Sequence, residues 1–425
     1  METRFSQRLI AVDNMNIIRN FYSWRCRIMS KDLSTRILHS GGARFAKKVA
    51  GMPSVPETLP IYQTSVFAFD NIADVDAIFD NETEGYIYTR IASPNADAVS
   101  EMLATADGGE KALVFASGMA AITTAILSFV GQGDHIISSP VLYGGVQNYL
   151  ANELPRFGVE VTFADILGGD ITPHIRPNTK LVYTETICNP LMEVPDLETL
   201  SRAAHAHGLT VLVDNTFATS MIAQPLALGV DAVLYSATKY LGGHNDVVAG
   251  AVVASAEVID RIRKFQIMYG SILSPHDCWL LARSMRTLDL RVRKHSKNAL
   301  EVAQFLEAQP QVAKVHYPGL LSSPSHERAN KQFLNGLYGG MLSIDLKGDS
   351  AAAHVMVREL DGILMVPSLA GTTTTVSWSA KTSHRFYDRE ERLNIGISDG
   401  QLRFSIGLED VRDLIAEFSE ALKKI

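Results

Sequence analysis

Asp214 and Lys239 are suited to act together, because each follows an apolar run that is typical of a buried strand. The two runs are Leu209–Val213 and Val230–Tyr235, and polar residues end both of them abruptly. In an open α/β sheet, ligand-contacting groups gather beyond the carboxyl ends of the strands, so we expect this carboxylate and this amine at one crevice. Pyridoxal phosphate (PLP) chemistry needs an amine that forms a Schiff base and an acid that faces the pyridine nitrogen. The pair therefore favours a PLP site.

The elements that must position this pair form a regular alternation of strand-like and helix-like segments from about residue 96 onward, which predicts an α/β fold with a largely parallel sheet. The predicted strands are Lys111–Phe115, His135–Ser138, Val159–Phe163, Lys180–Tyr183, Leu209–Val213, Val230–Tyr235 and Gly250–Ala254. Polar or aromatic residues follow several strand ends: Ser117, Tyr143, Glu185, Asn189, Asp214 and Lys239. Because these ends share one edge of a sheet, we expect the residues to line one site.

A backbone anion site is predicted where the first strand passes into a helix, at the small residues Ala116–Ala120. A helix that begins directly after a strand presents free N–H groups and its dipole to a phosphate. The segment has neither the GxGxxG fingerprint of dinucleotide binding nor a Walker loop. It indicates phosphate binding only in combination with the other motifs.

The length of 425 residues exceeds what one hydrophobic core usually holds, so we expect at least two lobes. A long helical stretch at 276–306 would link them. After it, strand-like and helix-like segments predict a smaller α+β lobe: Val312–Tyr317, Gly340–Asp345, 350–360, Gly362–Val366 and 409–424. Arg403 lies in the strand-like Leu402–Ser405, where it is compatible with a surface charge or with a partly buried guanidinium that binds a carboxylate.

The composition is that of an ordinary globular protein, with 46% hydrophobic and 20% charged residues. A formal net charge of −7 gives no indication of nucleic-acid binding. No apolar run approaches the ~20 residues that a membrane span requires. Cys26, Cys188 and Cys278 lie far apart without a CxxC pair, which favours a reducing cytoplasm, and the histidines show no metal-ligand spacing.

The N-terminal part of the chain divides into two segments. Residues 1–28 do not conform to the pattern of the rest, and we interpret them as an extension ahead of a more natural start at Met29. Residues 40–95 are irregular and end near Tyr88 and Arg90; such a long irregular segment often reaches a neighbouring subunit. Taken alone, these two side chains are equally compatible with a solvated edge.

Several motifs occur in a characteristic order: Ala116–Met119, Leu142–Gly145, Val213–Thr216, Asp231–Tyr240 and Gly242–Asp246. Over about residues 32–425 the chain thereby resembles the Cys/Met-metabolism family of PLP-dependent enzymes, which includes cystathionine and methionine γ-lyases, cystathionine γ-synthases and O-acetylhomoserine sulfhydrylases. The resemblance implies fold type I of the PLP-dependent transferases, with a mostly parallel seven-stranded sheet in a large domain and a smaller α+β C-terminal domain. It implies an arm at 29–91 that contacts the neighbouring subunit, a PLP-binding domain at 92–290 and a small domain at 291–425.

The resemblance also implies roles for residues at the matching positions. Lys239 matches the Schiff-base lysine that later shuttles protons, Asp214 the carboxylate at the pyridine nitrogen, and Tyr143 the tyrosine stacked on the ring. Asn189 matches the side chain near the 3′ oxygen of the cofactor, and Arg403 with Ser368 the clamp on the substrate α-carboxylate. The phosphate cradle matches Gly118, Met119, Ser236 and Thr238, completed by Tyr88 and Arg90 of the adjacent subunit. This arrangement implies a homotetramer built from dimers.

The implied reaction is γ-elimination on a γ-substituted L-amino acid through a vinylglycine-type intermediate, with Tyr143 as a candidate acid for the leaving group. Three departures from the family pattern concern the far end of the substrate. Gly145 stands where methionine γ-lyases usually have a cysteine, Asn148 where cystathionine γ-lyases tend to have an arginine, and Thr373 where a glutamate is common in cystathionine lyases. Together with Trp378, these departures predict that the group at the far end of the substrate side chain differs from that of cystathionine. Methionine, homocysteine and O-linked homoserine analogues such as canavanine are the candidates.

Two alternatives remain open. Within the family, the chain could catalyse γ-replacement on an acylated homoserine. From another class, Ser236 and Lys239 satisfy the Ser-x-x-Lys pattern of serine acyl-hydrolases, but the accompanying Ser-Asp-Asn and Lys-Thr-Gly motifs are absent.

Overall fold

A seven-stranded sheet forms the centre of the larger part of the molecule in the computed structural model, which describes residues 30–41, 54–80, 82–385 and 387–425. Its strands are β1 Lys111–Phe115, β2 His135–Ser138, β3 Glu160–Phe163, β4 Thr179–Glu185, β5 Thr210–Asp214, β6 Ala232–Tyr235 and β7 Gly250–Ala254. The strand order is β1-β7-β6-β5-β4-β2-β3, and β7 alone runs antiparallel to its neighbours in this sheet. The expectation of a mostly parallel seven-stranded sheet is therefore confirmed.

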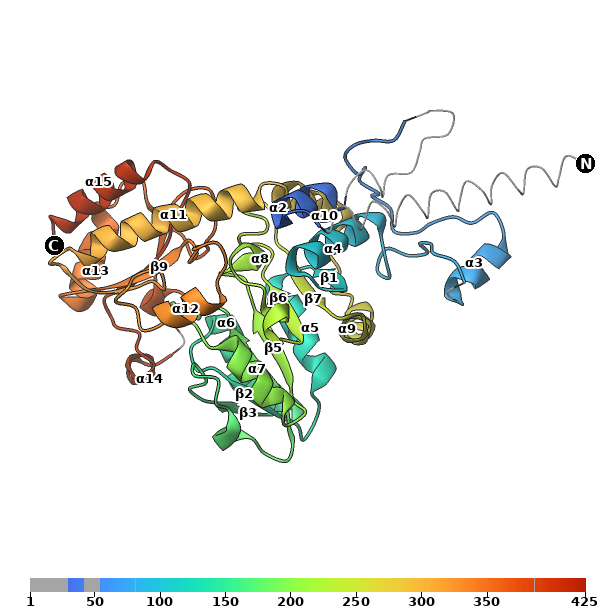
Figure 1. Cartoon of the computed structure of the whole chain (residues 1–425), viewed down its shortest axis with the longest axis horizontal. Coiled ribbons are helices and arrows are strands. Elements are labelled where there is room, and N and C mark those ends of the chain that lie inside the picture. The colour runs from blue at the N-terminus through green and yellow to red at the C-terminus, as the bar shows by residue number, and fades with distance from the viewer. Residues whose placement is uncertain (1–29, 42–53, 81, 386) are drawn as a thin grey trace, which may run out of the picture.

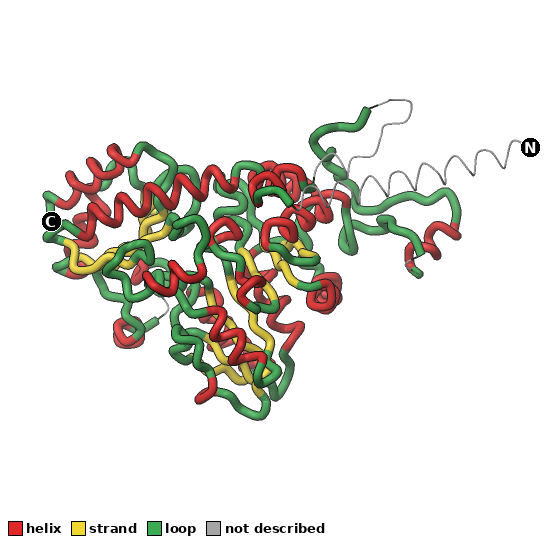
Figure 2. Tube along the Cα trace, viewed as in Figure 1, coloured by secondary structure: helices red, strands yellow, loops and turns green. Residues whose placement is uncertain are grey.

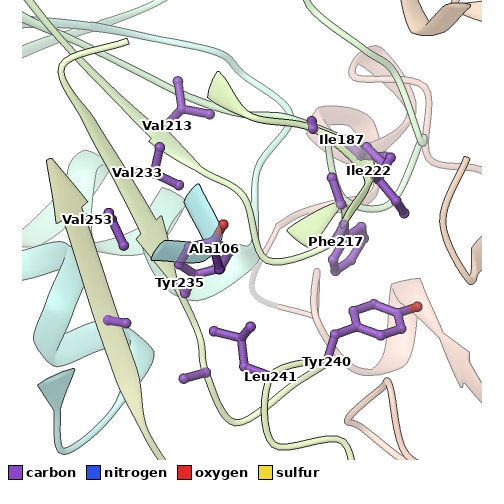
Figure 3. Packing of buried hydrophobic residues seen from close by; sticks show 14 of the residues in the cluster. Ala106, Ile187, Val213, Phe217, Ile222, Val233, Tyr235, Tyr240, Leu241 and Val253 are labelled. Carbon is purple, nitrogen blue, oxygen red and sulfur yellow. The ribbon is translucent and has the colours of Figure 1, made fainter. Parts of the chain in front are cut away.

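Both faces of this sheet are buried, because successive side chains of each strand enter different hydrophobic clusters. Val213, Val233 and Val253 lie side by side on β5, β6 and β7 and pack into one cluster (Figure 3). The alternate residues Leu212 and Leu234 pack into the cluster on the opposite face. Strands covered on both faces are expected to be apolar throughout, which explains why the sequence shows runs of apolar residues here rather than strict alternation.

Helices cover the two faces of the large sheet. One cluster takes in α4, α7 and α10, and the other takes in α5 and α9. The helices of this part are α2 Leu33–His39, α3 Ile72–Phe79, α4 Pro94–Asp107, α5 Gly118–Phe129, α6 Gly144–Asn148, α7 Leu197–His205, α8 Thr219–Ile222, α9 Ala256–Tyr269 and α10 Pro275–Met285. Figures 1 and 2 show these layers around the strands. None of the helices in the described residues is long and apolar enough to cross a membrane.

A second, five-stranded sheet lies in the C-terminal part and has its own hydrophobic cluster (Figure 1). Its strands are β8 Val312–His316, β9 Met341–Leu346, β10 Leu364–Met365, β11 Thr375–Trp378 and β12 Gln401–Ser405, in the order β10-β11-β12-β9-β8. The accompanying helices are α11 Leu288–Glu307, α12 His326–Gln332, α13 Asp349–Glu359, α14 Arg389–Asn394 and α15 Val411–Leu422. The smaller α+β part that the sequence predicts is present.

Three local predictions differ from the structure. The helical stretch at 276–306 is two helices, α10 and α11, because the chain turns at Arg286 and Thr287. The strand expected at Gly362–Val366 is reduced to the two residues of β10. Strand β11 was not predicted, since the run of threonines before it carries no clear alternation of polar and apolar residues.

The N-terminal part of the described chain contains α3, a helix inside the segment that we expected to be irregular. Asn71 caps it by accepting a hydrogen bond from the Asp74 N–H, yet no residue of the helix is buried, and Ile72 and Phe79 are exposed. Figure 1 shows α3 projecting away from both sheets. The predicted extension at residues 1–28 lies outside the described residues.

A buried hydrogen-bonded chain runs from α4 toward the strand ends. The Tyr235 hydroxyl donates to Asp107 Oδ1 at 2.5 Å and accepts from Asn215 Nδ2 at 2.9 Å. Asn215 Oδ1 in turn accepts from the Thr186 hydroxyl at 2.8 Å. Burial raises the pKa of Asp107 to about 7, because the charged carboxylate has lost its hydration. Asn215, the residue next to Asp214, is thus held through Tyr235 by Asp107, an acid whose burial favours its protonated form.

We expect Asp107→Asn to change how stability depends on pH. In the unfolded chain Asp107 ionises near pH 4, whereas in the folded protein it keeps its proton up to about pH 7, so the folded wild type loses stability as the pH rises between these values. Between pH 5 and pH 8 that loss amounts to about 2–3 kcal/mol, and the Asn variant is free of it. Urea unfolding of both proteins at the two pH values measures the difference. Asp260→Asn, which removes a carboxylate from an exposed ion pair with Lys111, serves as the control; equal pH profiles for wild type and Asp107→Asn would contradict the assignment.

Candidate active site

A cavity of about 620 Å³ lies at the carboxyl edge of the large sheet, where elements of the C-terminal part close over it. This volume is in the range of small-molecule sites. Most of the site residues predicted from the sequence line it: Gly118, Met119, Tyr143, Asn189, Asp214, Ser236, Thr238, Lys239, Ser368 and Arg403. Residues that are far apart in the sequence therefore meet in one place, as the strand-end argument predicts.

Two buried carboxylates stand next to each other at the sheet edge, because Glu185 and Asp214 are the paired last residues of β4 and β5. Asp214 Oδ1 accepts the Thr216 N–H at 2.8 Å, and burial raises the pKa of Asp214. Burial and the neighbouring Asp214 also raise the pKa of Glu185. A positively charged or proton-donating group in the cavity would favour the ionised form of Asp214.

The amine of Lys239 lies inside the cavity, on the turn that follows β6. Its Nζ donates to the Ser368 hydroxyl at 2.8 Å, so the serine that it contacts is not the Ser236 of the Ser-x-x-Lys pattern. Burial and the positive charge of Arg403 lower the pKa of Lys239. A larger fraction of this amine is therefore neutral and nucleophilic than for an exposed lysine.

The N-terminus of α5 forms one wall of the cavity. The Ser117 side chain caps the helix by accepting the Ala120 N–H at 3.1 Å. The N–H groups of Gly118 and Met119, in the first turn, have no acceptor within the helix. A Cβ on Gly118 would lie 2.7 Å from the Cβ of Ser236. The glycine thus lets the helix approach the loop after β6 closely, and the wall presents backbone donors suited to a phosphate.

A buried guanidinium completes the cavity on the side of the second sheet. Arg403 in β12 is 4% exposed, and its Nη1 donates to Asn189 Oδ1 at 2.7 Å. Its Nε has no hydrogen-bond partner among the described residues. Burial lowers the pKa of Arg403 to about 10, which still leaves the group charged at neutral pH. An unpaired buried donor on a cation indicates an anionic ligand.

Glu185 connects the groups on opposite sides of the cavity. Its Oε1 accepts the Tyr143 N–H at 2.7 Å and its Oε2 accepts the Asn189 N–H at 3.0 Å. Since Asn189 also binds Arg403, one hydrogen-bonded chain joins the tyrosine loop, the sheet edge and the guanidinium. The sequence placed Glu185 among the strand-end residues expected to line the site, but it assigned this residue no role.

The donor set fits PLP: a partly neutral buried amine, an acid at a strand end, backbone N–H groups at a helix N-terminus and a buried guanidinium. Comparisons with known proteins lead to the same cofactor, since residues 47–423 match the family described as Cys/Met metabolism PLP-dependent enzyme. The chain belongs to this family.

Individual members of the Cys/Met metabolism family are similar to the chain over nearly its whole length. L-methionine gamma-lyase of Treponema denticola is 43% identical over 371 residues, covering 86% of this chain and 92% of that protein. Cystathionine beta-lyase of Lactococcus lactis subsp. cremoris is 39% identical over 394 residues, covering 92% and 99%. The crystal structure of cystathionine gamma-lyase from Lactobacillus plantarum complexed with L-serine superposes with a TM-score of 0.85 at 34% identity, covering 93% of this chain and 99% of that one. The chain is therefore a PLP-dependent enzyme with the fold of this family.

Four of the predicted site residues do not line the cavity of their own chain. Asn148 is exposed on α6 and accepts a hydrogen bond from Asn152, and Thr373 is exposed ahead of β11. Tyr88 and Arg90 lie in the N-terminal arm, where Arg90 Nη1 donates to the Ile267 carbonyl.

Trp378 and Gly145 also lie elsewhere than expected. Trp378, which we took as a sign of an altered pocket, is buried in the cluster of the second sheet. Gly145 is not a lining residue either, but a Cβ there would lie 2.6 Å from the Tyr143 ring, so this glycine makes room for the tyrosine.

Sequence reasoning missed the part of the cavity wall that β11 and the segment after it form. Ser377, Lys381, Thr382, Ser383 and Arg385 line the cavity and were not singled out. Only a correct assignment of β11 would have shown that the residues after it return to the site.

We expect Glu185→Gln to lower kcat/KM by about 10- to 100-fold. The amide has one acceptor oxygen, so its NH₂ group must face the N–H of either Tyr143 or Asn189, and a buried donor is left unpaired. Steady-state kinetics with any accepted amino acid checks this loss. Glu160→Gln, at an exposed ion pair on β3, is the matched control, and an unchanged kcat/KM for Glu185→Gln would contradict the proposed connection.

We expect Gly118→Ala to weaken PLP binding by about tenfold or more, because the added methyl group forces the N-terminus of α5 away from Ser236. Titration of the cofactor-free enzyme with PLP, followed by absorbance, gives the dissociation constant. At Gly131 a Cβ meets nothing within 4 Å, so Gly131→Ala is the control. Equal affinities for the two variants would show that this close approach does not shape the cradle.

Proposed function

We propose that this enzyme catalyses γ-elimination on a γ-substituted L-amino acid. The observation that carries the proposal is the meeting of Lys239, Asp214 and Arg403 in one cavity, with the amine 2.8 Å from Ser368 Oγ. The relatives named as L-methionine gamma-lyases support this reaction type. The proposal assigns each of the cavity residues a task at a stated atom of the substrate.

Arg403, together with Ser368, binds the α-carboxylate of the substrate. The guanidinium is buried and already oriented by Asn189, so it need not be desolvated or ordered when the substrate binds. Fixing the carboxylate places Cα–H beside Lys239.

Lys239 would hold PLP, and its amine would remove the proton at Cα of the substrate and then transfer the proton at Cβ. Its depressed pKa suits this use, because a general base works best with a pKa close to the working pH. PLP, when bound, supplies an electron sink that makes the Cα–H bond acidic, and Asp214 maintains this sink by facing the pyridine nitrogen. Gly118, Met119, Ser236 and Thr238 would hold its phosphate, and Asn189 would contact its 3′ oxygen.

Tyr143 protonates the group that leaves Cγ. It lines the cavity, and its phenol ring packs against Gly145. Its backbone is held by Glu185, which fixes the loop while the side chain, 47% exposed, remains able to adjust to the substrate. A thiolate or alkoxide leaving group departs more readily when it is protonated, so an acid on this side favours the reaction.

The neighbouring subunit completes the site in this proposal. Tyr88 and Arg90 of the arm at 29–91 bind the cofactor phosphate of the adjacent subunit, within a homotetramer of two such dimers. In support, neither residue lines the cavity of its own chain, and α3 on the same arm buries none of its residues. The proposal keeps the domain division at residues 92–290 and 291–425, with one of the two sheets in each part.

The finer choice of substrate is also a proposal. Methionine, homocysteine, cystathionine-like thioethers and O-linked homoserine analogues such as canavanine are candidates. The second candidate reaction is γ-replacement on an acylated homoserine, since the same residues would serve it. A relative named cystathionine beta-lyase is nearly as similar to the chain as those named methionine gamma-lyases.

Product identification by mass spectrometry distinguishes these reactions. The enzyme with PLP is given methionine, homocysteine, cystathionine, O-acetylhomoserine or canavanine, each with and without a thiol. We expect 2-oxobutanoate or homoserine without thiol, from one clearly preferred substrate. A new thioether that forms only with thiol would show that the enzyme catalyses γ-replacement and not γ-elimination.

We expect Lys239→Ala to abolish turnover and to make PLP removable by dialysis, because the covalent attachment and the base are lost together. Absorbance of the dialysed protein and product formation measure the two effects. Lys180→Ala, at an exposed residue near the opposite end of β4, is the control and retains both. Turnover by Lys239→Ala above the background rate would exclude the role of Lys239.

A further inference from the structure

The segment 379–385 lies against the loop that carries Tyr143. A Cβ on Gly144 would lie 2.0 Å from the carbonyl oxygen of Ser383, so the two backbones are in close contact. The imidazole of His384 is fully buried, and its Nδ1 lies 2.9 Å from the Ser383 hydroxyl, within hydrogen-bonding distance. The segment is thus anchored beside the residue that we assign to the leaving group.

This anchored segment brings two cations to the cavity, Lys381 and Arg385. Both are exposed, and among the described residues neither forms an ion pair. The Lys381 ammonium lies 5.7 Å from the centre of the Trp378 ring, which restricts where its side chain can point. Burial lowers the pKa of His384 to about 4, so this histidine adds no charge at neutral pH.

The other charged residues of the cavity already have assigned roles. Glu185 is occupied by two backbone N–H groups, and Asp214 is reserved for the cofactor nitrogen. Arg403 is directed at the α-carboxylate and Lys239 at the cofactor. Lys381 and Arg385 therefore add positive charge to the cavity with no assigned partner, on a segment that abuts the loop of Tyr143.

We propose that Lys381 and Arg385 bind an anionic group at the far end of the substrate side chain, beyond Cγ. The proposal rests on the proposed γ-elimination and specifies its substrate class: a γ-substituted amino acid whose departing group carries a carboxylate or a phosphate. An ammonium and a planar guanidinium bind either anion through charge-assisted hydrogen bonds. Protonated canavanine, which ends in a cation, is disfavoured by the same two residues.

A charge-matched pair of substrates tests the proposal. S-(2-carboxyethyl)-L-homocysteine and its carboxamide analogue have nearly the same size and both release 2-oxobutanoate on γ-elimination, but only the first has a negative far end. The readout is the ratio of their kcat/KM values in the PLP-loaded enzyme. O-phospho-L-homoserine is tested in the same proteins to distinguish a phosphate from a carboxylate as the preferred anion.

The test variant combines Lys381→Gln with Arg385→Gln. The control combines Lys180→Gln with Lys314→Gln, which removes two exposed cations from β4 and β8 outside the cavity and so keeps the net charge matched. We expect the wild type to prefer the carboxylate about tenfold, since an exposed ion pair contributes about threefold to fivefold per cation. The ratio falls toward one in the test variant and stays unchanged in the control.

High salt provides a second readout that a merely structural role would not produce. At 0.5 M KCl the preference shrinks in the wild type but not in the test variant, because exposed charges are screened. Equal ratios for wild type and test variant, both for the carboxylate pair and for O-phospho-L-homoserine, overturn the inference while γ-elimination stands. If no γ-substituted substrate, methionine included, gives 2-oxobutanoate or homoserine, the proposed function itself has failed.

Discussion

The buried carboxylate of Glu185 is the interaction on which the geometry of the site depends. It accepts the backbone N–H of Tyr143 with one oxygen and that of Asn189 with the other. Through Asn189 it also determines where Arg403 lies. A carboxylate in a buried environment is costly unless its acceptors are satisfied, so both loops must close onto it for the fold to tolerate it. The fold thereby sets the spacing between the proposed acid and the proposed carboxylate clamp.

The parallel sheet explains why the chemistry gathers where it does. Glu185 and Asp214 end adjacent strands, and Lys239 follows the next one, so three segments of the chain deliver functional groups to a single edge. The antiparallel β7 does not disturb this edge, because it lies between β6 and β1 and the helix after β1 still begins there. Strands that are packed on both faces position these functional side chains more rigidly than loops alone would.

This dependence on strand ends also determines what the sequence could predict. Asp214 and Lys239 follow apolar runs that are readable without a structure, and the helix start at Gly118 is marked by its small residues. Arg403 was ambiguous because its burial depends on β9 and β11 pairing on either side of β12, a long-range contact. Thr373 and Trp378 were placed at the far end of the substrate by their positions in the family pattern, whereas in the structure Thr373 precedes β11 and Trp378, within β11, packs into the core of the second sheet.

The two sheets contribute different groups to the site, and this difference concerns substrate specificity. The first sheet and its helix carry the groups that any PLP-dependent step on an amino acid needs: an amine, an acid and a phosphate cradle. The segment after β11 contributes a further part of the cavity wall, including Lys381 and Arg385, which we propose to bind the far end of the substrate. Because this segment approaches the tyrosine loop through backbone atoms at Gly144 and Ser383, its exposed side chains can differ without moving that loop. In our proposal, substrate choice therefore resides in a part of the chain separate from the residues that perform the chemistry.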